Sequence, residues 1–152
     1  MSDAIVFADA SPRLGLPMLF AGQAQKEFFV NEAHALIDAL LHGAIEGEAA
    51  SPPAAPADGQ AWLVGEAAAG AWSGQAGRIA ARQGGNWLFV TPRDGMRVLD
   101  RATGQELLFC GGWRRPTRPA APAGGAVVDS EARVAITQLL AALCIAGIFP
   151  AG

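Results

Sequence analysis

The sequence has no tyrosine and only two cysteines, Cys110 and Cys144. Two thiols far apart in the chain do not form a disulfide framework, and neither a CxxC spacing nor a His–Cys pairing predicts a zinc site. We therefore expect a reduced protein, made in the bacterial cytoplasm, that needs no cofactor.

Basic residues are scarce, since 11 Lys and Arg against 14 Asp and Glu give a net charge of -3. Nucleic-acid-binding proteins usually present a basic face to the phosphates, so we expect no nucleic-acid partner. Arg114, Arg115 and Arg118 form a local exception in a proline-rich segment. A solvated linker is the simpler interpretation, and contact with an acidic surface or an anionic polysaccharide is the alternative.

Long hydrophobic runs are absent too. The most apolar stretch, residues 134–149, is shorter than the roughly 20 residues that cross a bilayer, and it contains Gln138. No basic start followed by an apolar core suggests a signal peptide. We expect a soluble protein without membrane insertion.

Glycine and proline, in contrast, are abundant, with 19 and 10 residues. Together with many alanines, which bury little area each, they predict short strands around a thin core that neighbouring subunits complete. Gly84-Gly85 is a hairpin signal between two strand patterns. Strands are expected at Gln60–Val64, Arg78–Gln83, Asn86–Thr91, Met96–Leu99 and Glu106–Cys110. In the third of these, alternation places Trp87 and Leu88 on opposite faces, so we expect both faces to be at least partly covered.

Two helices with apolar stripes flank this region. Asn31 is the expected cap of the first, and Asp129 or Ser130 that of the second. The second helix is too apolar to be half solvated, so it must pack on the β unit or on copies of itself. The candidate oligomer-interface residues are Leu36, Ile37, Leu40, Ile136, Leu139, Leu140 and Leu143.

The predicted fold class is therefore α+β, a small antiparallel β-meander flanked by an N-terminal helix and a C-terminal oligomerising helix. The expected segments are an extended arm (1–21), a helical segment (22–47), the β module (58–113), a Pro/Ala/Gly linker (114–128) and the C-terminal helix (129–152).

Catalytic motifs are missing: there is no nucleophile elbow, P-loop or dinucleotide fingerprint, so we expect no enzyme. His34, Asp38 and His42 share one helix face, but the two imidazoles lie about 12 Å apart by helical rise and cannot hold one ion. His34 with Asp38 could bind a metal only weakly. A solvated polar face is the preferred interpretation, and an ion on an oligomer axis is the alternative.

Four tryptophans, Trp62, Trp72, Trp87 and Trp113, lie in the β region. Indole rings stack on sugar faces, but they also supply large apolar area to a thin core. Core packing is expected for Trp62 and Trp87, which follow strand patterns. Trp72 and Trp113 lie in glycine-rich loops, where core packing and glycan binding remain equally open.

An ordered series of motifs resembles the DUF2793 family of alphaproteobacterial prophages and gene transfer agents. The resemblance covers roughly residues 16–113. It rests on Gly22-Gln23-Ala24-Gln25-Lys26, Val30-Asn31-Glu32-Ala33, Leu36-Ile37-Asp38-Ala39-Leu40, Pro56-Ala57-Asp58-Gly59, Gly70-Ala71-Trp72-Ser73-Gly74-Gln75-Ala76-Gly77 and Trp87-Leu88-Phe89-Val90-Thr91-Pro92-Arg93-Asp94-Gly95. Met96 departs from it, because a tryptophan is common there. No catalytic residue can be transferred.

Similar sequences occur as modules of phage-like tail fibres and head spikes. The resemblance therefore implies a virion structural protein, a homo-oligomer (trimer or pentamer) that contacts other particle proteins and helps attach to host capsular polysaccharide. Head and tail locations both stay open. The alternative is a glycan-binding module that uses exposed tryptophans, with assembly incidental.

Overall fold

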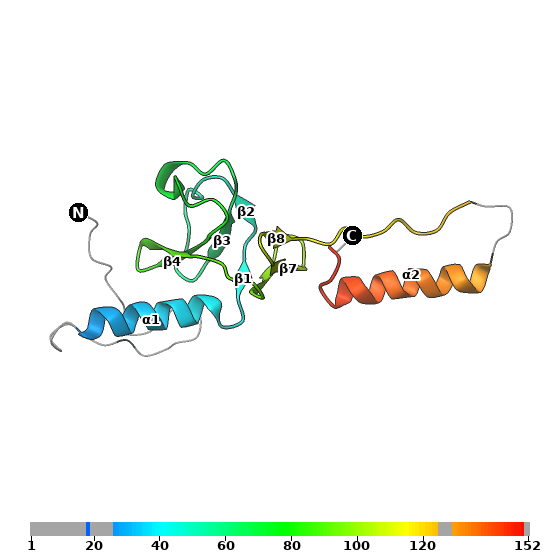
Figure 1. Cartoon of the computed structure of the whole chain (residues 1–152), viewed down its shortest axis with the longest axis horizontal. Helices are drawn as coiled ribbons and strands as arrows, with labels where there is room; N and C mark the ends of the chain where they lie inside the picture. Colours follow the sequence, from blue (N-terminus) through cyan, green and yellow to red (C-terminus); the bar gives the residue numbers. More distant parts are fainter. Residues whose placement is uncertain (1–17, 19–25, 125–128, 151–152) are drawn as a thin grey trace.

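The structure is a computed structural model that describes residues 18, 26–124 and 129–150 (Figure 1). It is α+β, as expected, with one helix before the strands and one after them. The elements are α1 (Lys26–Leu40), β1 (Ala44–Ile45), β2 (Glu48–Ala49), β3 (Ala61–Val64), the short 3-10 helix η1 (Gly70–Trp72), β4 (Ile79–Gln83), β5 (Asn86–Val90), β6 (Arg97–Asp100), β7 (Gln105–Phe109), β8 (Trp113–Arg114) and α2 (Ser130–Ile145). Of the predicted N-terminal arm, only Met18 lies within the described residues.

The strands form two four-stranded sheets, ordered β1-β6-β7-β8 and β2-β3-β4-β5. Each sheet is mixed, because β1 pairs in parallel with β6 and β2 in parallel with β3. The prediction of a single antiparallel meander was therefore incomplete. The five predicted strands lie within a residue of β3 to β7, but β1, β2 and β8 are two residues long, too short to leave an alternating pattern.

The β4–β5 hairpin forms as its glycine pair predicts. Gln83 faces Asn86 across a two-residue turn. Gly84 and Gly85 have φ values of 54° and 74°, the left-handed conformation that a type I′ turn requires at both central positions.

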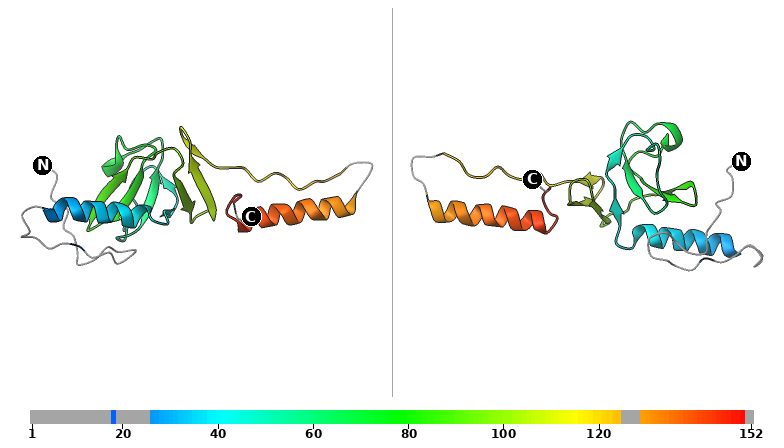
Figure 2. Two further views of the ribbon diagram at one scale, coloured as in Figure 1. Left: turned by 60° about the horizontal axis from the view of Figure 1, so that its bottom comes forward. Right: turned by 180° about the vertical axis from the view of Figure 1, so that it is seen from behind.

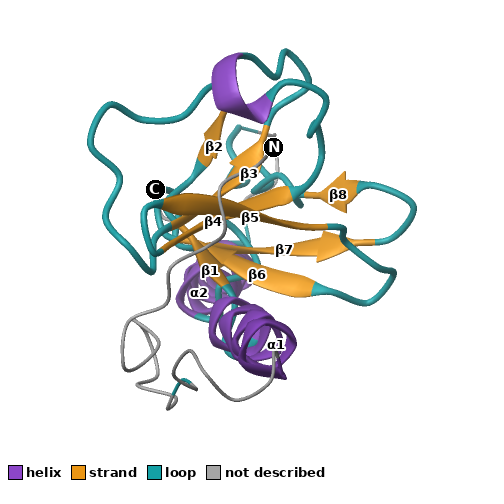
Figure 3. Ribbon diagram, turned by 90° about the vertical axis from the view of Figure 1, so that its left-hand side faces the viewer, coloured by secondary structure: helices purple, strands orange, loops and turns teal. Residues whose placement is uncertain are grey.

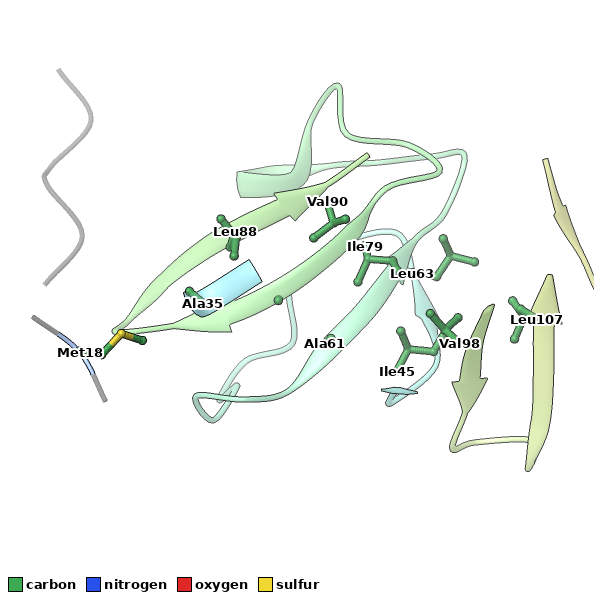
Figure 4. Close-up of a cluster of buried hydrophobic side chains, with 11 residues drawn as sticks. Met18, Ala35, Ile45, Ala61, Leu63, Ile79, Leu88, Val90, Val98 and Leu107 are labelled. Atoms are coloured by element: carbon green, nitrogen blue, oxygen red, sulfur yellow. The ribbon is translucent and has the colours of Figure 1, made fainter. Parts of the chain in front are cut away.

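The main hydrophobic core connects both sheets to α1 (Figure 4). Alternating residues of β4 and β5, including Ile79, Leu88 and Val90, face this core, and β6 and β7 add Val98 and Leu107. The opposite face of the β2–β5 sheet carries a second cluster beneath the η1 loop. Figure 3 shows that loop and α1 on opposite sides of the sheets. Both faces of the β2–β5 sheet are thus covered, as the alternation predicted.

Helix α1 turns its more polar side toward the sheets. Asn31, Ala35 and Asp38 are its buried residues, spaced so that they share one face. Asn31 is therefore an interior residue of the helix and not its cap, because the helix begins five residues earlier. Most of the apolar stripe lies on the other, exposed side of the helix, where Ile37 and Leu40 are at least 36% exposed.

Helix α2 belongs to an arm that extends from the β unit (Figures 1 and 2). The linker runs outward, and α2 returns alongside it. Asp129 caps the helix by accepting a 2.9 Å hydrogen bond from the Ala132 N–H, as predicted. The Arg133 guanidinium donates to the Pro122 carbonyl at 3.3 Å, which ties the linker to the helix.

Residues 146–150, the C-terminal hook, fasten the end of this arm to β7. The Glu106 N–H donates to the Gly147 carbonyl at 2.7 Å. The buried Gln105 amide donates to the Ile148 carbonyl at 2.9 Å and to the Pro116 carbonyl at 2.6 Å. One glutamine therefore holds both ends of the arm to the sheet.

Candidate functional site

Trp72 is a core residue, and its candidacy for glycan binding was wrong. Its side chain is 0% exposed and packs on Val64 and Ala80 beneath the η1 loop. A ring without an exposed face cannot stack on a sugar. The physical reason is that the glycine-rich loop folds back over the sheet and inserts this indole as its anchor.

Trp62 and Trp87 flank the buried indole, as half-buried members of the same cluster. The ring centroids of Trp72 and Trp87 lie 5.0 Å apart in an edge-to-face arrangement. The Arg82 guanidinium lies 5.0 Å from the Trp87 ring centroid, within cation–π range. The core role expected for Trp62 and Trp87 is therefore confirmed.

Trp113 remains partly exposed and borders a cleft between the two sheets. The cleft has a volume of about 310 Å³. Its lining residues come from β2, β3, the segment after β3, Gly77, β8 and the start of the linker: Glu48, Leu63, Val64, Gly65, Glu66, Gly77, Trp113 and Arg115. The indole Nε1–H donates to the Gly77 carbonyl at 2.9 Å, which fixes the ring between the sheets.

A second link across the cleft is ionic. Arg115 donates from Nη1 to Asp100 Oδ2 at 2.5 Å and from Nη2 to Glu48 Oε2 at 3.0 Å. Asp100 is 1% exposed, so the guanidinium neutralises a buried carboxylate. The interpretation of this arginine as part of a solvated linker was wrong.

Sequence reasoning missed Glu48, Gly65 and Glu66 as residues of this cleft. Glu48 lies in a two-residue strand without a recognisable pattern, and only the β2–β3 pairing brings it beside Gly65. A Cβ on Gly65 would lie 3.4 Å from Glu48 Oε1, so a larger side chain there would crowd the carboxylate. No local signal in the sequence reveals this contact.

The polar face of α1 is not the solvated surface that we expected. Asp38 is buried against the sheet, His34 is half-buried and His42 is exposed just beyond the helix. Among the described residues, no three His, Cys, Asp or Glu side chains are arranged to hold a metal ion.

The seven candidate interface residues divide between the chain's own core and its surface. Leu36 packs against the main core. Leu140 is only 6% exposed, so the assignment of Leu140 to an intersubunit surface was wrong. Leu140 follows Arg133 by seven residues, which places it on the helix side that faces the linker. Large exposed fractions remain at Ile37, Leu40, Ile136 and Leu139, while Leu143 is half-buried.

Both helices expose further large apolar side chains that the sequence analysis did not single out. Phe29 on α1 is 72% exposed, and Ile145 on α2 is 90% exposed. Residues 134–145 contain no charged side chain. The charges of α2 are confined to its first turns, where the Glu131 pKa is lowered by a backbone hydrogen bond and by the Ser130 hydroxyl, which donates to its carboxylate at 2.9 Å.

No helix within the described part of the chain is both long enough and apolar enough to span a membrane.

Comparison with known proteins identifies a family for this sequence. A family model described as "Protein of unknown function (DUF2793)" matches residues 30–114, which is more than half of the chain. The match covers most of α1, all eight strands and every residue of the cleft except Arg115. No curated protein matches the sequence.

Proposed function

Because the chain belongs to the DUF2793 family, and because its helices leave apolar faces uncovered, we propose that it is a non-catalytic structural module that assembles with copies of itself. The particle it serves is a phage-like one, such as a prophage or a gene transfer agent particle, in which the module forms part of a head spike or tail fibre. This second part rests on the family resemblance alone.

The assembly proposal rests mainly on the uncovered apolar surface of helix α2. Leu140 is its one fully buried residue, although apolar side chains surround most of its circumference. A helix that is apolar on all sides is normally buried. At 16 residues it is about 24 Å long, which is sufficient for an intersubunit helical bundle.

A second copy of this chain is the occupant that the composition of α2 favours. Val134, Leu139 and Ile145 leave apolar surface on several sides of the helix. Identical helices whose residues 134–145 are all uncharged satisfy one another without any charge complementarity, whereas an unrelated partner would have to supply its own apolar groove. Closed rotational symmetry gives each copy the same environment, and a trimer or a pentamer suits an appendage.

Helix α1 supports the proposal with a separate surface. Its outward side presents Phe29 and Ile37, both at least 48% exposed, and Leu41, just beyond the end of the helix, is 50% exposed. Because this surface lies at the opposite end of the molecule from α2 (Figure 1), it is available for contacts with other particle proteins or with further copies.

Multi-angle light scattering tests the assembly by measuring the mass of the full-length protein. The protein concentration is varied from roughly 1 to about 100 micromolar, the range in which interfaces of this kind associate. We expect one closed oligomer over most of this range. A folded monomer throughout would overturn the assembly proposal. Locating the chain by mass spectrometry in purified phage-like particles tests the particle assignment separately.

Glycan binding with incidental assembly is the second candidate function. The cleft beside Trp113 supports it, because an aromatic ring and carboxylates line it together. Loss of polysaccharide binding in a variant that still forms the oligomer would separate this activity from assembly.

A further inference from the structure

The cleft between the two sheets combines features of a sugar-binding site. We propose that it binds an uncharged, hydroxyl-rich saccharide, with Trp113 as the stacking ring and with Glu48 and Glu66 as acceptors for sugar hydroxyls. This inference rests on the second candidate function, glycan binding, and it assigns to that function a location and a class of ligand.

Trp113 is held in position before any ligand arrives. Its Nε1–H donates to the Gly77 carbonyl at 2.9 Å, and its ring meets Phe109 edge to face at a centroid distance of 5.3 Å. A ring fixed by two contacts loses little conformational freedom when a ligand binds. Its remaining exposed surface offers an apolar platform for the C–H face of a pyranose.

The carboxylates provide the polar half of the site. Glu48 Oε2 accepts from Arg115 at 3.0 Å, which fixes the position of this carboxylate. Glu66 is exposed, and it enters none of the ion pairs formed within the described residues. Carboxylate oxygens form strong charge-assisted hydrogen bonds with hydroxyl donors.

The balance of charges decides which sugars fit. Two carboxylates, Glu48 and Glu66, line the cleft together with one guanidinium, Arg115, which also pairs with the buried Asp100, so the local formal charge is negative. Arg115 is already committed to Asp100 and Glu48 and has no free charge to attract an acid. A uronic acid would therefore be repelled, whereas neutral and N-acetylated sugars would not.

The size of the cleft limits the length of the ligand. A volume of about 310 Å³ lies at the lower end of the range for small-molecule sites, roughly 300–1,000 Å³. The cleft therefore accepts a short stretch of a polysaccharide, and its lining includes both the Trp113–Gly77 hydrogen bond and the Arg115–Glu48 pair.

An array of immobilised oligosaccharides tests this site, with neutral hexoses, N-acetylated amino sugars and uronic acids as three groups. The assembled full-length protein is expected to bind members of the first two groups and none of the third. The strongest hit is then titrated calorimetrically against two variants. Glu66→Gln should weaken binding about tenfold, the usual effect of losing a charged hydrogen bond. Asp58→Asn is the matched control, because it removes the same charge from an exposed turn outside the cleft.

Glu66 is chosen because its side chain is exposed and its replacement does not disturb the core, whereas Trp113 packs against the core. Wild-type affinity in Glu66→Gln would overturn the location, and uronic-acid binding would overturn the ligand class. An oligomer that binds no saccharide on the array would overturn the inference while leaving the assembly proposal intact. A protein that binds saccharide but remains a monomer would overturn the assembly proposal while leaving this inference intact.

Discussion

Replacing Leu139 by glutamate should dissociate the proposed oligomer while leaving the subunit folded. Leu139 is 59% exposed on α2. Fully burying a leucine contributes about 1.5–3 kcal/mol, so covering the exposed part contributes about 1–2 kcal/mol per copy. In a trimer this amounts to about 3–5 kcal/mol, or two to four orders of magnitude in the association constant.

The carboxylate introduced by Leu139→Glu adds to this loss, because each copy would bring a charge into an apolar interface. The isolated subunit has no reason to respond, since substitutions at exposed positions usually change the free energy of unfolding by less than about 0.5 kcal/mol. Sedimentation velocity over a concentration series measures the oligomer, and circular dichroism verifies the fold.

Two further variants sharpen the experiment. Leu139→Met conserves volume and should keep the oligomer. Leu140→Ala alters the neighbouring residue that the subunit itself buries, so it should loosen the arm at every concentration, including those at which the wild type is monomeric. If Leu139→Glu retains the wild-type mass distribution, α2 is not the interface and the reasoning from its uncovered surface is refuted.

Further substitutions test the interior of the subunit. Trp72→Ala should lower the free energy of unfolding by about 3–5 kcal/mol, measured by urea denaturation, because it empties the second cluster; a stable variant would contradict the core assignment. Arg115→Met should lower the free energy of unfolding by about 2–4 kcal/mol, which is less than for a fully buried ion pair because the guanidinium is partly solvated. Adding Asp100→Asn to this variant should restore part of the lost stability. Gln105→Ala should speed amide hydrogen exchange in the hook and in α2 but not in β4, and equal rates would exclude the proposed fastening. The Glu131 pKa is lowered in the folded helix, so the Glu131 carboxylate stabilises the helix at pH values above its unfolded pKa, and this stabilisation is lost as the pH falls through the folded pKa. Glu131→Gln should therefore remove part of the acid-induced loss of helicity, and identical titration curves for the variant and the wild type would contradict this prediction.

The sequence predicted those parts of the fold that depend on local patterns. The Gly84-Gly85 turn requires positive φ at two successive residues, and glycine supplies both. The Asp129 cap depends on one side chain and one nearby N–H. Such features follow from neighbours in the chain, so no knowledge of the tertiary structure was needed to find them.

The cleft and the parallel strand pairs could not be predicted in this way. Glu48 and Arg115 are separated by 67 positions, and the ion pair between them exists only because the two sheets pack together. Asp100 ends β6 and Arg115 follows β8 in the same sheet, so their ion pair also depends on strand pairing and not on neighbouring positions in the chain. Loop composition likewise could not distinguish Trp72, which the η1 loop buries, from Trp113, which stays at the surface.

The outward orientation of the apolar side of α1 follows from the alanine content of the sheet. Ala61 and Ala81 face the main core where Ala35 packs against it. Small side chains on both surfaces let a helix approach a sheet closely, and they leave no space for Phe29 or Ile37 between the two layers. The large side chains are therefore left on the outside, and a helix that packs on its sheet through alanines has its largest apolar surfaces available for contacts with other molecules.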